Sequence, residues 1–218
     1  MGKTKKELRE DSFVQFWYDT VEKIKPYLNL LTVIILVIAA AVVAWVVIRV
    51  LSERSEEAAL AALGDSTTAE QLRNVPESYL KTSVGPMLVF SLAQKREAED
   101  KPENREELAR TWQRLLDLKP SDYFQLQAHM GLGKLALVQE KWQDALAHFE
   151  AAVSSPLTFM SAEAIWYKGW SLEKLNRTED ALNTYRSLLT RTEQVQGHLW
   201  TEMATYRLSQ LERHLAGG

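Results

Sequence analysis

The residue types that most often carry chemistry in proteins are scarce and far apart in this sequence. The 218-residue chain has no cysteine, which excludes disulfides, thiolate nucleophiles and thiolate metal sites. Its histidines, His129, His148, His198 and His214, fall on different predicted helices. The sequence contains no His-Glu-x-x-His, Gly-x-Ser-x-Gly, phosphate-loop or dinucleotide-binding motif. We therefore predict that the protein is not an enzyme and uses no cofactor or metal.

The ionisable residues that could have carried chemistry fit structural roles instead. His129 takes a bulky packing position in its predicted helix, so a buried structural imidazole is favoured over a ligand. The acidic pairs Glu56-Glu57 and Glu106-Glu107 fit solvated helix faces. A net charge of −3 gives no indication of the clustered basic face that nucleic-acid binding requires.

The composition predicts an all-α protein. Ala, Leu, Glu, Gln and Arg, which favour helices, dominate the chain, and only nine Gly and six Pro interrupt it. The β-branched residues Val and Ile concentrate between Val33 and Val50. The rest of the sequence is left with little that favours strands.

That concentration of apolar residues predicts a membrane anchor. No charged residue occurs from Pro26 to Ile48. At a rise of about 1.5 Å per residue, roughly 20 helical residues cross a hydrocarbon core of about 30 Å. We predict a single transmembrane helix over residues 27–50. The alternatives are a buried core helix, for which the domain is small, and a cleaved signal peptide, for which the apolar run is long.

Basic residues are distributed unevenly around this helix. The leader, residues 1–26, is rich in them, whereas the other flank offers Arg49 and Arg54 among acidic residues. An excess of Lys and Arg marks the cytoplasmic side of a span, so we expect a cytoplasmic N-terminus. The basic residues of the leader are Lys3, Lys5, Lys6, Arg9, Lys23 and Lys25.

The segments on either side of the span also show helical patterns. In the leader, Phe13, Phe16, Trp17, Val21 and Ile24 recur at helical spacing, which favours an interfacial helix over a flexible tail. Residues 51–83 form a predicted helical linker, in which Ser52–Leu63 continues the membrane helix into solvent.

The remainder of the chain repeats with one clear period. Ala109, Ala145 and Ala181 are spaced by 36 residues. A small residue at a helix crossing, an aromatic ring four residues later and a closing proline define one helical hairpin per period. Such hairpins must stack to bury their apolar faces, and we expect Gly133 to meet Ala145 at one crossing. The same period relates Pro120 to Pro156, Gly133 to Gly169, and Phe149 to Tyr185.

The unit from Leu126 to Pro156 resembles the tetratricopeptide repeat. It carries Leu132-Gly133 in its first helix and Ala145, Phe149 and Ala152 in its second. The next unit departs from the pattern at Lys168 and Leu188. The resemblance implies an α-solenoid of about three tetratricopeptide-like hairpins over residues 84–218, closed by a capping helix from Gly197 to His214.

The same resemblance implies a partner-binding groove, because the first helices of such repeats line a concave face. The aromatic residues Trp166 and Trp170 lie one helical turn apart, where they anchor an apolar segment of a partner or pack against the capping helix. Carried onto this sequence, the groove consists of Phe90, Gln94, Gln127, Met130, Lys134, Glu163, Trp166 and Trp170.

The layout as a whole is similar to a narrower family. The basic leader, single span, short linker and three hairpins resemble the bacterial inner-membrane ancillary subunits of the SecYEG translocon. The stretches Tyr79–Ser83, Gly131–Ala136 and Tyr206–Glu212 resemble theirs as well. The resemblance implies a single-pass bacterial inner-membrane protein with a periplasmic C-terminal domain that works beside the secretion channel and periplasmic chaperones.

Two functions therefore compete. The first is a membrane-tethered protein–protein interaction module that docks secreted polypeptides or chaperones near the secretion channel, on the extracytoplasmic face. The second is a structural or assembly subunit built permanently into a larger membrane complex. Both have protein partners and contact membrane lipid through one span. An enzyme with an unrecognised site is the least favoured reading, because helical-repeat scaffolds rarely carry chemistry without a recognisable set of residues.

Overall fold

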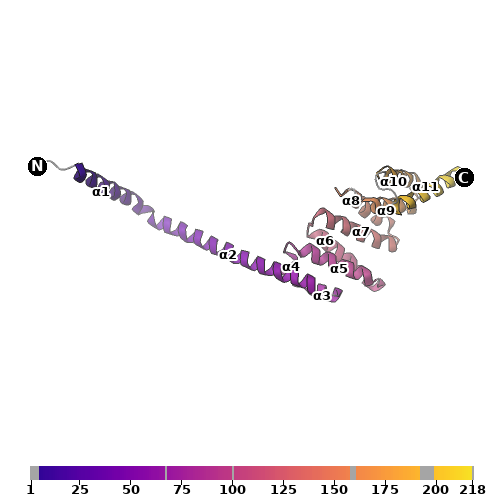
Figure 1. Ribbon diagram of the computed structural model, residues 1–218, viewed down its shortest axis with the longest axis horizontal. Helices are drawn as coiled ribbons and strands as arrows, with labels where there is room; N and C mark the ends of the chain where they lie inside the picture. Colours follow the sequence, from indigo (N-terminus) through magenta and orange to yellow (C-terminus); the bar gives the residue numbers. More distant parts are fainter. Residues whose placement is uncertain (1–4, 67, 100, 158–160, 192–198, 218) are drawn as a thin grey trace. The chain divides into compact units, whose positions relative to one another are not determined.

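The computed structural model describes residues 5–66, 68–99, 101–157, 161–191 and 199–217 (Figure 1). In these ranges every regular element is a helix, so the predicted all-α class is confirmed. The chain divides into two compact units, residues 1–54 and 55–218.

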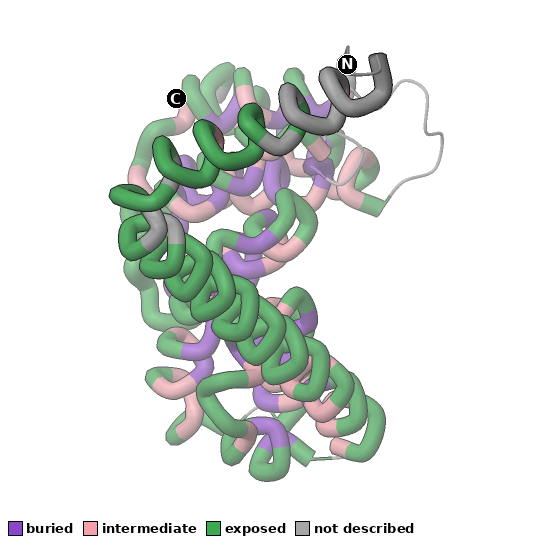
Figure 2. Tube along the Cα trace, turned by 90° about the vertical axis from the view of Figure 1, so that its left-hand side faces the viewer, coloured by how far each residue is buried: buried purple, intermediate pink, exposed green. Residues whose placement is uncertain are grey.

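The first unit contains α1 (Lys5–Ile24), η1 (Lys25–Tyr27) and most of the long helix α2 (Leu28–Asp65). The pyrrolidine ring of Pro26 lacks an N–H group, and a short 3₁₀ turn separates the two α-helices at this position. From Thr32 onward, α2 is long and apolar enough to cross a membrane by length and composition, a test that a signal sequence also passes. Figure 2 shows this helix as almost entirely exposed, while buried residues recur throughout the hairpin helices.

The second unit is a stack of antiparallel hairpins. The helices α5 (Gly85–Glu99) and α6 (Arg105–Asp117) form the first hairpin, with the short η2 (Pro102–Asn104) between them. The second consists of α7 (Asp122–Val138) and α8 (Trp142–Val153), and the third of α9 (Ser161–Lys174) and α10 (Thr178–Arg191). Each hairpin packs on the next, and α11 (Leu199–Gly217) packs on α10 and α9 as the predicted cap. Gly197, the predicted start of that cap, lies outside the described residues.

Before the first hairpin, two short helices and the end of α2 join its core. These helices are α3 (Ala69–Arg73), which begins with a capping box between Thr68 and Gln71, and α4 (Glu77–Leu80). Leu72 and Leu80 are buried in the same apolar cluster as Leu88 of α5. Ala59 of α2 is also fully buried there, so the end of α2 is not simply the solvent-exposed continuation expected from the sequence.

The repeated glycines make room for aromatic rings within the hairpins. A Cβ atom on Gly133 would lie 2.7 Å from the ring of Phe149, and one on Gly169 would lie 2.4 Å from the ring of Tyr185. The atoms nearest to a Cβ on Gly133 would therefore belong to Phe149 rather than to Ala145. Ala145 lies on the same helix as Phe149, α8, and is fully buried. The shared period of glycine and aromatic residue reflects this direct contact.

The turns inside the second and third hairpins also repeat. Glu140 and Asn176 both adopt the left-handed conformation, with φ of 59° and 57°. The amide of Lys141 donates to the carbonyl of Ala136 and that of Arg177 to the carbonyl of Leu172, both at 2.9 Å. This is the Schellman arrangement that satisfies the last carbonyls of a helix. It gives both hairpins the same turn geometry.

Candidate functional site

The structure distributes the predicted groove residues over three levels of burial. Gln94 is exposed. Met130 and Trp166 are buried, with exposed fractions of 5% and 9%. Between these extremes are the half-buried residues Phe90, Gln127, Lys134, Glu163 and Trp170.

The indole of Trp166 lies in the middle of a group of aromatic rings. Its ring centroid is 5.6 Å from those of Trp170 and Trp200, and 5.0 Å from that of Tyr167. Trp200 belongs to α11, so Trp166 packs against the capping helix, which is the alternative considered for it in the sequence analysis. Trp170 and Tyr167 form the half-exposed part of the group. Together these rings give an amphipathic surface on α9 supported by a buried indole.

A charged pair borders this aromatic surface. Lys134 of α7 contacts Glu163 of α9 at 2.7 Å, and its Nζ lies 5.7 Å from the ring centroid of Tyr167. Burial alone favours the neutral amine, but the hydrogen bond and charge of Glu163 outweigh it and raise the pKa of Lys134. Burial also raises the pKa of the Tyr167 phenol. Lys134 therefore stays charged and links the first helices of two successive hairpins.

Phe90 belongs to a different aromatic group. Its ring centroid lies 5.2 Å from Phe124, 5.9 Å from Tyr123 and 6.0 Å from Trp112. Phe90 packs on the apolar cluster of the first hairpin, whereas Trp166 and Trp170 pack on those of the later hairpins. The predicted groove residues thus fall into two separate aromatic groups along the stack.

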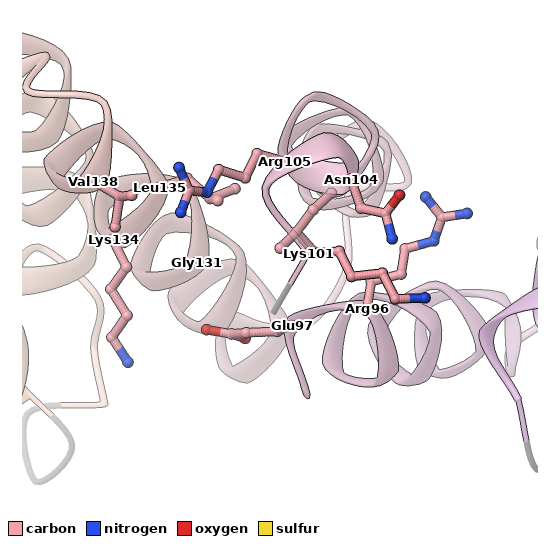
Figure 3. Close-up of a pocket in the computed structure, with 10 residues that line it drawn as sticks. Arg96, Glu97, Lys101, Asn104, Arg105, Gly131, Lys134, Leu135 and Val138 are labelled. Carbon is pink, nitrogen blue, oxygen red and sulfur yellow. The ribbon is translucent and has the colours of Figure 1, made fainter. Parts of the chain in front are cut away.

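Between the first two hairpins lies a cleft of about 130 Å³ (Figure 3). Four basic residues line it, but Figure 3 shows that they do not converge. The guanidinium of Arg105 lies by Leu135, Lys134 points the opposite way, and Arg96 turns toward Asn104. The lining basic residues are Arg96, Lys101, Arg105 and Lys134. The cleft is not arranged around a single anion.

Sequence reasoning missed a histidine pair. The Nδ1 atoms of His129 and His148 lie 3.3 Å apart, and both rings are half-buried. Burial lowers both pKa values; the charge of His148 lowers that of His129 further, and Asp144 partly offsets the effect at His148. His129 and His148 lie 19 residues apart on two different helices, and the repeat period does not pair them, so the sequence carried no clear signal of this contact. Among the described residues, no group of three His, Asp or Glu is arranged to hold a metal ion.

Comparison with known proteins agrees with this geometry. The tetratricopeptide repeat family model matches residues 109–157 and 130–196, which include the second hairpin, α9 and α10. The stack of hairpins, the capping helix and the match to the family model together define the class of the second unit. It is a tetratricopeptide-like α-solenoid, as the sequence predicted. Solenoids of this class are protein–protein interaction modules and typically not enzymes, which indicates protein partners here.

The other comparisons add little. A solved structure described as "MamA RS-1 ArsTM double mutant" is similar at 14% identity and a TM-score of 0.45, covering 75% of this chain and 96% of that one. At this level of similarity it carries no argument. No curated protein matches the chain significantly.

Proposed function

We propose that this protein is a membrane-tethered interaction module that docks secreted polypeptides or chaperones near the secretion channel. In this proposal α2 is the tether, crosses the bacterial inner membrane once, and contacts its lipid. The N-terminus is cytoplasmic and the hairpins are periplasmic. The apolar length of α2 and the basic leader support this arrangement.

The half-exposed aromatic surface of α9 is the observation that carries the docking role. Trp170 and Tyr167 are half-buried, and the buried Trp166 packs against both rings, while Tyr167 also stacks on Phe149. Rigid aromatic side chains of this kind dominate the free energy of protein interfaces, because little side-chain entropy is lost on binding. The Lys134–Glu163 pair at the border supplies polar contacts that orient a bound segment.

The accessible members of the predicted groove are the ones expected to touch the partner. They are Phe90, Gln94, Gln127, Lys134, Glu163 and Trp170, whereas Met130 and Trp166 would act by supporting them. A segment that covers only the later hairpins would contact Lys134, Glu163 and Trp170. A longer one would also reach Phe90.

Substitution of Trp170 tests the docking role. We expect Trp170→Ala to weaken partner capture by well over tenfold, since a hot-spot aromatic contributes about 2–4 kcal/mol. Capture is measured by pull-down and mass spectrometry from mild detergent, and folding by thermal melting of the same sample. Trp142→Ala is the matched control, because Trp142 is also a half-buried indole but lies on α8.

Loss of capture in Trp170→Ala alone, with cooperative melting retained, supports the proposal. Loss of melting would instead assign Trp170 to the core. Full capture by a stably folded Trp170→Ala would show that partners dock elsewhere.

A permanent subunit of a membrane complex is the second candidate. The side chains of α1 favour it, because Phe13, Phe16 and Trp17 are 63%, 65% and 54% exposed and lie within helical reach of one another. Such a row suits packing on other subunits as well as an interfacial position. Stoichiometric co-migration with fixed partners after mild detergent extraction supports this candidate, and migration as a monomer or dimer supports the docking module.

A further inference from the structure

A cleft lined by arginines lies at the start of the hairpin stack. It has a volume of about 340 Å³ and is bounded by α5, α6 and the segment that contains α3 and α4. Its ionisable lining consists of four arginines and one carboxylate, that of Glu107. The arginines are Arg73, Arg96, Arg110 and Arg114.

Arg96 is buried without enough acceptors. Its side chain is only 6% exposed, and its Nη2 atom donates to Glu107 Oε1 at 2.7 Å. The Nε and Nη1 atoms are buried and have no hydrogen-bond partner among the described residues. Buried donors are nearly always paired in folded proteins, and an unpaired charged one is costly. Two of the three nitrogens of the guanidinium therefore lack an acceptor.

Glu107 shows which acceptor the cleft accommodates. This one carboxylate serves two guanidinium groups, since Arg73 Nε also lies 3.4 Å from the same Oε1 atom. The hydrogen bond from Arg96 is the main cause that lowers the pKa of Glu107, so the carboxylate stays charged. Arginine pairs with carboxylates through its planar fork of N–H donors.

The two other arginines form ion pairs only with exposed carboxylates at the surface. Arg110 pairs with Glu106 at 2.5 Å, and the side chains are 72% and 80% exposed. Arg114 pairs with Glu77 and is 47% exposed. Solvent-exposed pairs of this kind contribute little to stability, so an incoming carboxylate exchanges with them at little cost.

From these contacts we infer that the cleft binds an acidic side chain, Asp or Glu, of a partner polypeptide. The ligand carboxylate accepts from Arg96 inside the cleft and from Arg73 and Arg110 at its rim. It adds to the carboxylate of Glu107 rather than replacing it. The assignment rests on the proposed function, which makes the ligand a polypeptide, and it names a contact separate from the aromatic surface of α9.

The test uses the full chain in detergent and two short peptides. One peptide is rich in glutamate, and the other has glutamine at every glutamate position. We expect the glutamate peptide to bind and the glutamine peptide to bind at least about tenfold more weakly, because hydrogen bonds to charged groups carry the contact. Affinity for the glutamate peptide should fall as salt is raised. Equal binding of both peptides would overturn the inference.

Variants locate the contact. Arg73→Gln combined with Arg110→Gln should weaken glutamate-peptide binding about tenfold, since two charge-assisted hydrogen bonds are lost. Arg186→Gln is the control, because Arg186 is an exposed, paired arginine on α10, outside the cleft. Unchanged binding in the double variant, or an equal loss in the control, overturns the assignment.

The variant Glu107→Gln is expected to respond more strongly to the glutamate peptide, whereas the arginine variants are expected to respond more weakly. Without the internal carboxylate, Arg96 lacks an anionic partner and Arg73 keeps only Glu70, at 3.8 Å, so the glutamate peptide should raise the melting temperature of this variant more than that of the unchanged protein. A smaller increase contradicts the inference. Inorganic phosphate is titrated in parallel, and tighter binding of phosphate than of the glutamate peptide would assign the cleft to a phosphate ligand instead.

The two proposals fail separately. If the arginine variants still capture the whole partner protein and Trp170→Ala does not, the docking function is supported and the assignment of the cleft is wrong. If the glutamate peptide binds but no polypeptide is captured by the full chain, the cleft binds carboxylates and the docking function falls.

Discussion

At the residue scale, the second and third hairpins each depend on a glycine that leaves room for an aromatic ring. Gly133→Ala would place a Cβ atom 2.7 Å from the fully buried ring of Phe149, so the ring or the helix must move. Overpacking of this kind costs about 1–3 kcal/mol. For a chain of this size each kcal/mol lowers the melting temperature by about 2–4 °C. Melting followed by circular dichroism measures the change.

Gly64 supplies the matched control. It is an exposed helical position, and an added Cβ would have nothing within 4 Å. Alanine favours a helix over glycine by about 0.5–1 kcal/mol, so Gly64→Ala should leave the melting temperature unchanged or raise it slightly. An equal fall in the melting temperature of both variants would mean that the loss of stability does not come from the position of Gly133 in the repeat.

The histidine pair makes stability depend on pH. An unfolded histidine has a pKa of about 6.5. Burial lowers the pKa of His129 and of His148 in the folded protein, so folding favours the neutral rings. This contribution is fully present above the unfolded pKa and is lost as the pH falls through it toward the folded values. We expect a lower melting temperature at about pH 5.5 than at about pH 7.5 from this pair, in addition to other titrations.

Substitution separates the pair from those other titrations. His148→Gln removes one ring and should reduce the difference between the two melting temperatures. His214→Gln removes an exposed imidazole on α11 and should leave it unchanged. If both variants keep the full difference, the acid sensitivity arises outside the pair.

At the scale of elements, a buried carboxylate links the capping helix to the third hairpin. Glu173 of α9 accepts a hydrogen bond from the Tyr185 hydroxyl at 2.7 Å and from Arg207 Nε of α11 at 3.2 Å. Its side chain is only 9% exposed. Glu173→Ala leaves both donors without their acceptor, which costs about 1–3 kcal/mol. Because only Arg207 lies on α11, hydrogen exchange should increase most in that helix.

The exposed ion pair between Arg186 of α10 and Glu212 of α11 is the comparison. Both side chains are more than half exposed, so Glu212→Ala should cost at most about 1 kcal/mol. Equal exchange in α11 for both substitutions would show that the apolar contacts of Ala204 and Leu208 alone hold the cap.

Local sequence patterns predicted the elements, but not the contacts between distant ones. Gly133 and Phe149 both recur with the repeat, but the sequence led to Ala145 rather than Phe149 as the expected neighbour of Gly133. Arg207 lies 34 residues from Glu173, and nothing local marks the two as partners. The burial of Arg96 was not predicted either, because the short helices α3 and α4 pack on α5 beside it. Short helices such as these have too few residues to show a clear apolar period.

At the scale of the whole molecule, the hairpins form a continuous series of interfaces from α3 to α11. In such a stack each unit is stabilised by its neighbours. The arginine cleft lies near one end of the series, and Trp170 lies beside the cap at the other. A partner segment that uses both sites must therefore run along the hairpins, with its acidic residues toward α3 and its apolar residues toward α11.

The last prediction concerns the side of the membrane on which the hairpins lie. Lys and Arg in the leader exceed those after the span, which predicts export of the C-terminal domain. Alkaline phosphatase fused after Gly218 should be active, and a fluorescent protein that folds only in the cytoplasm should stay dark. Lys23→Gln and Lys25→Gln combined with Glu56→Lys and Glu57→Lys weakens the charge bias near the span, so part of the population should invert. An inactive phosphatase with a fluorescent reporter in the unchanged protein would contradict the orientation and, with it, docking on the extracytoplasmic face.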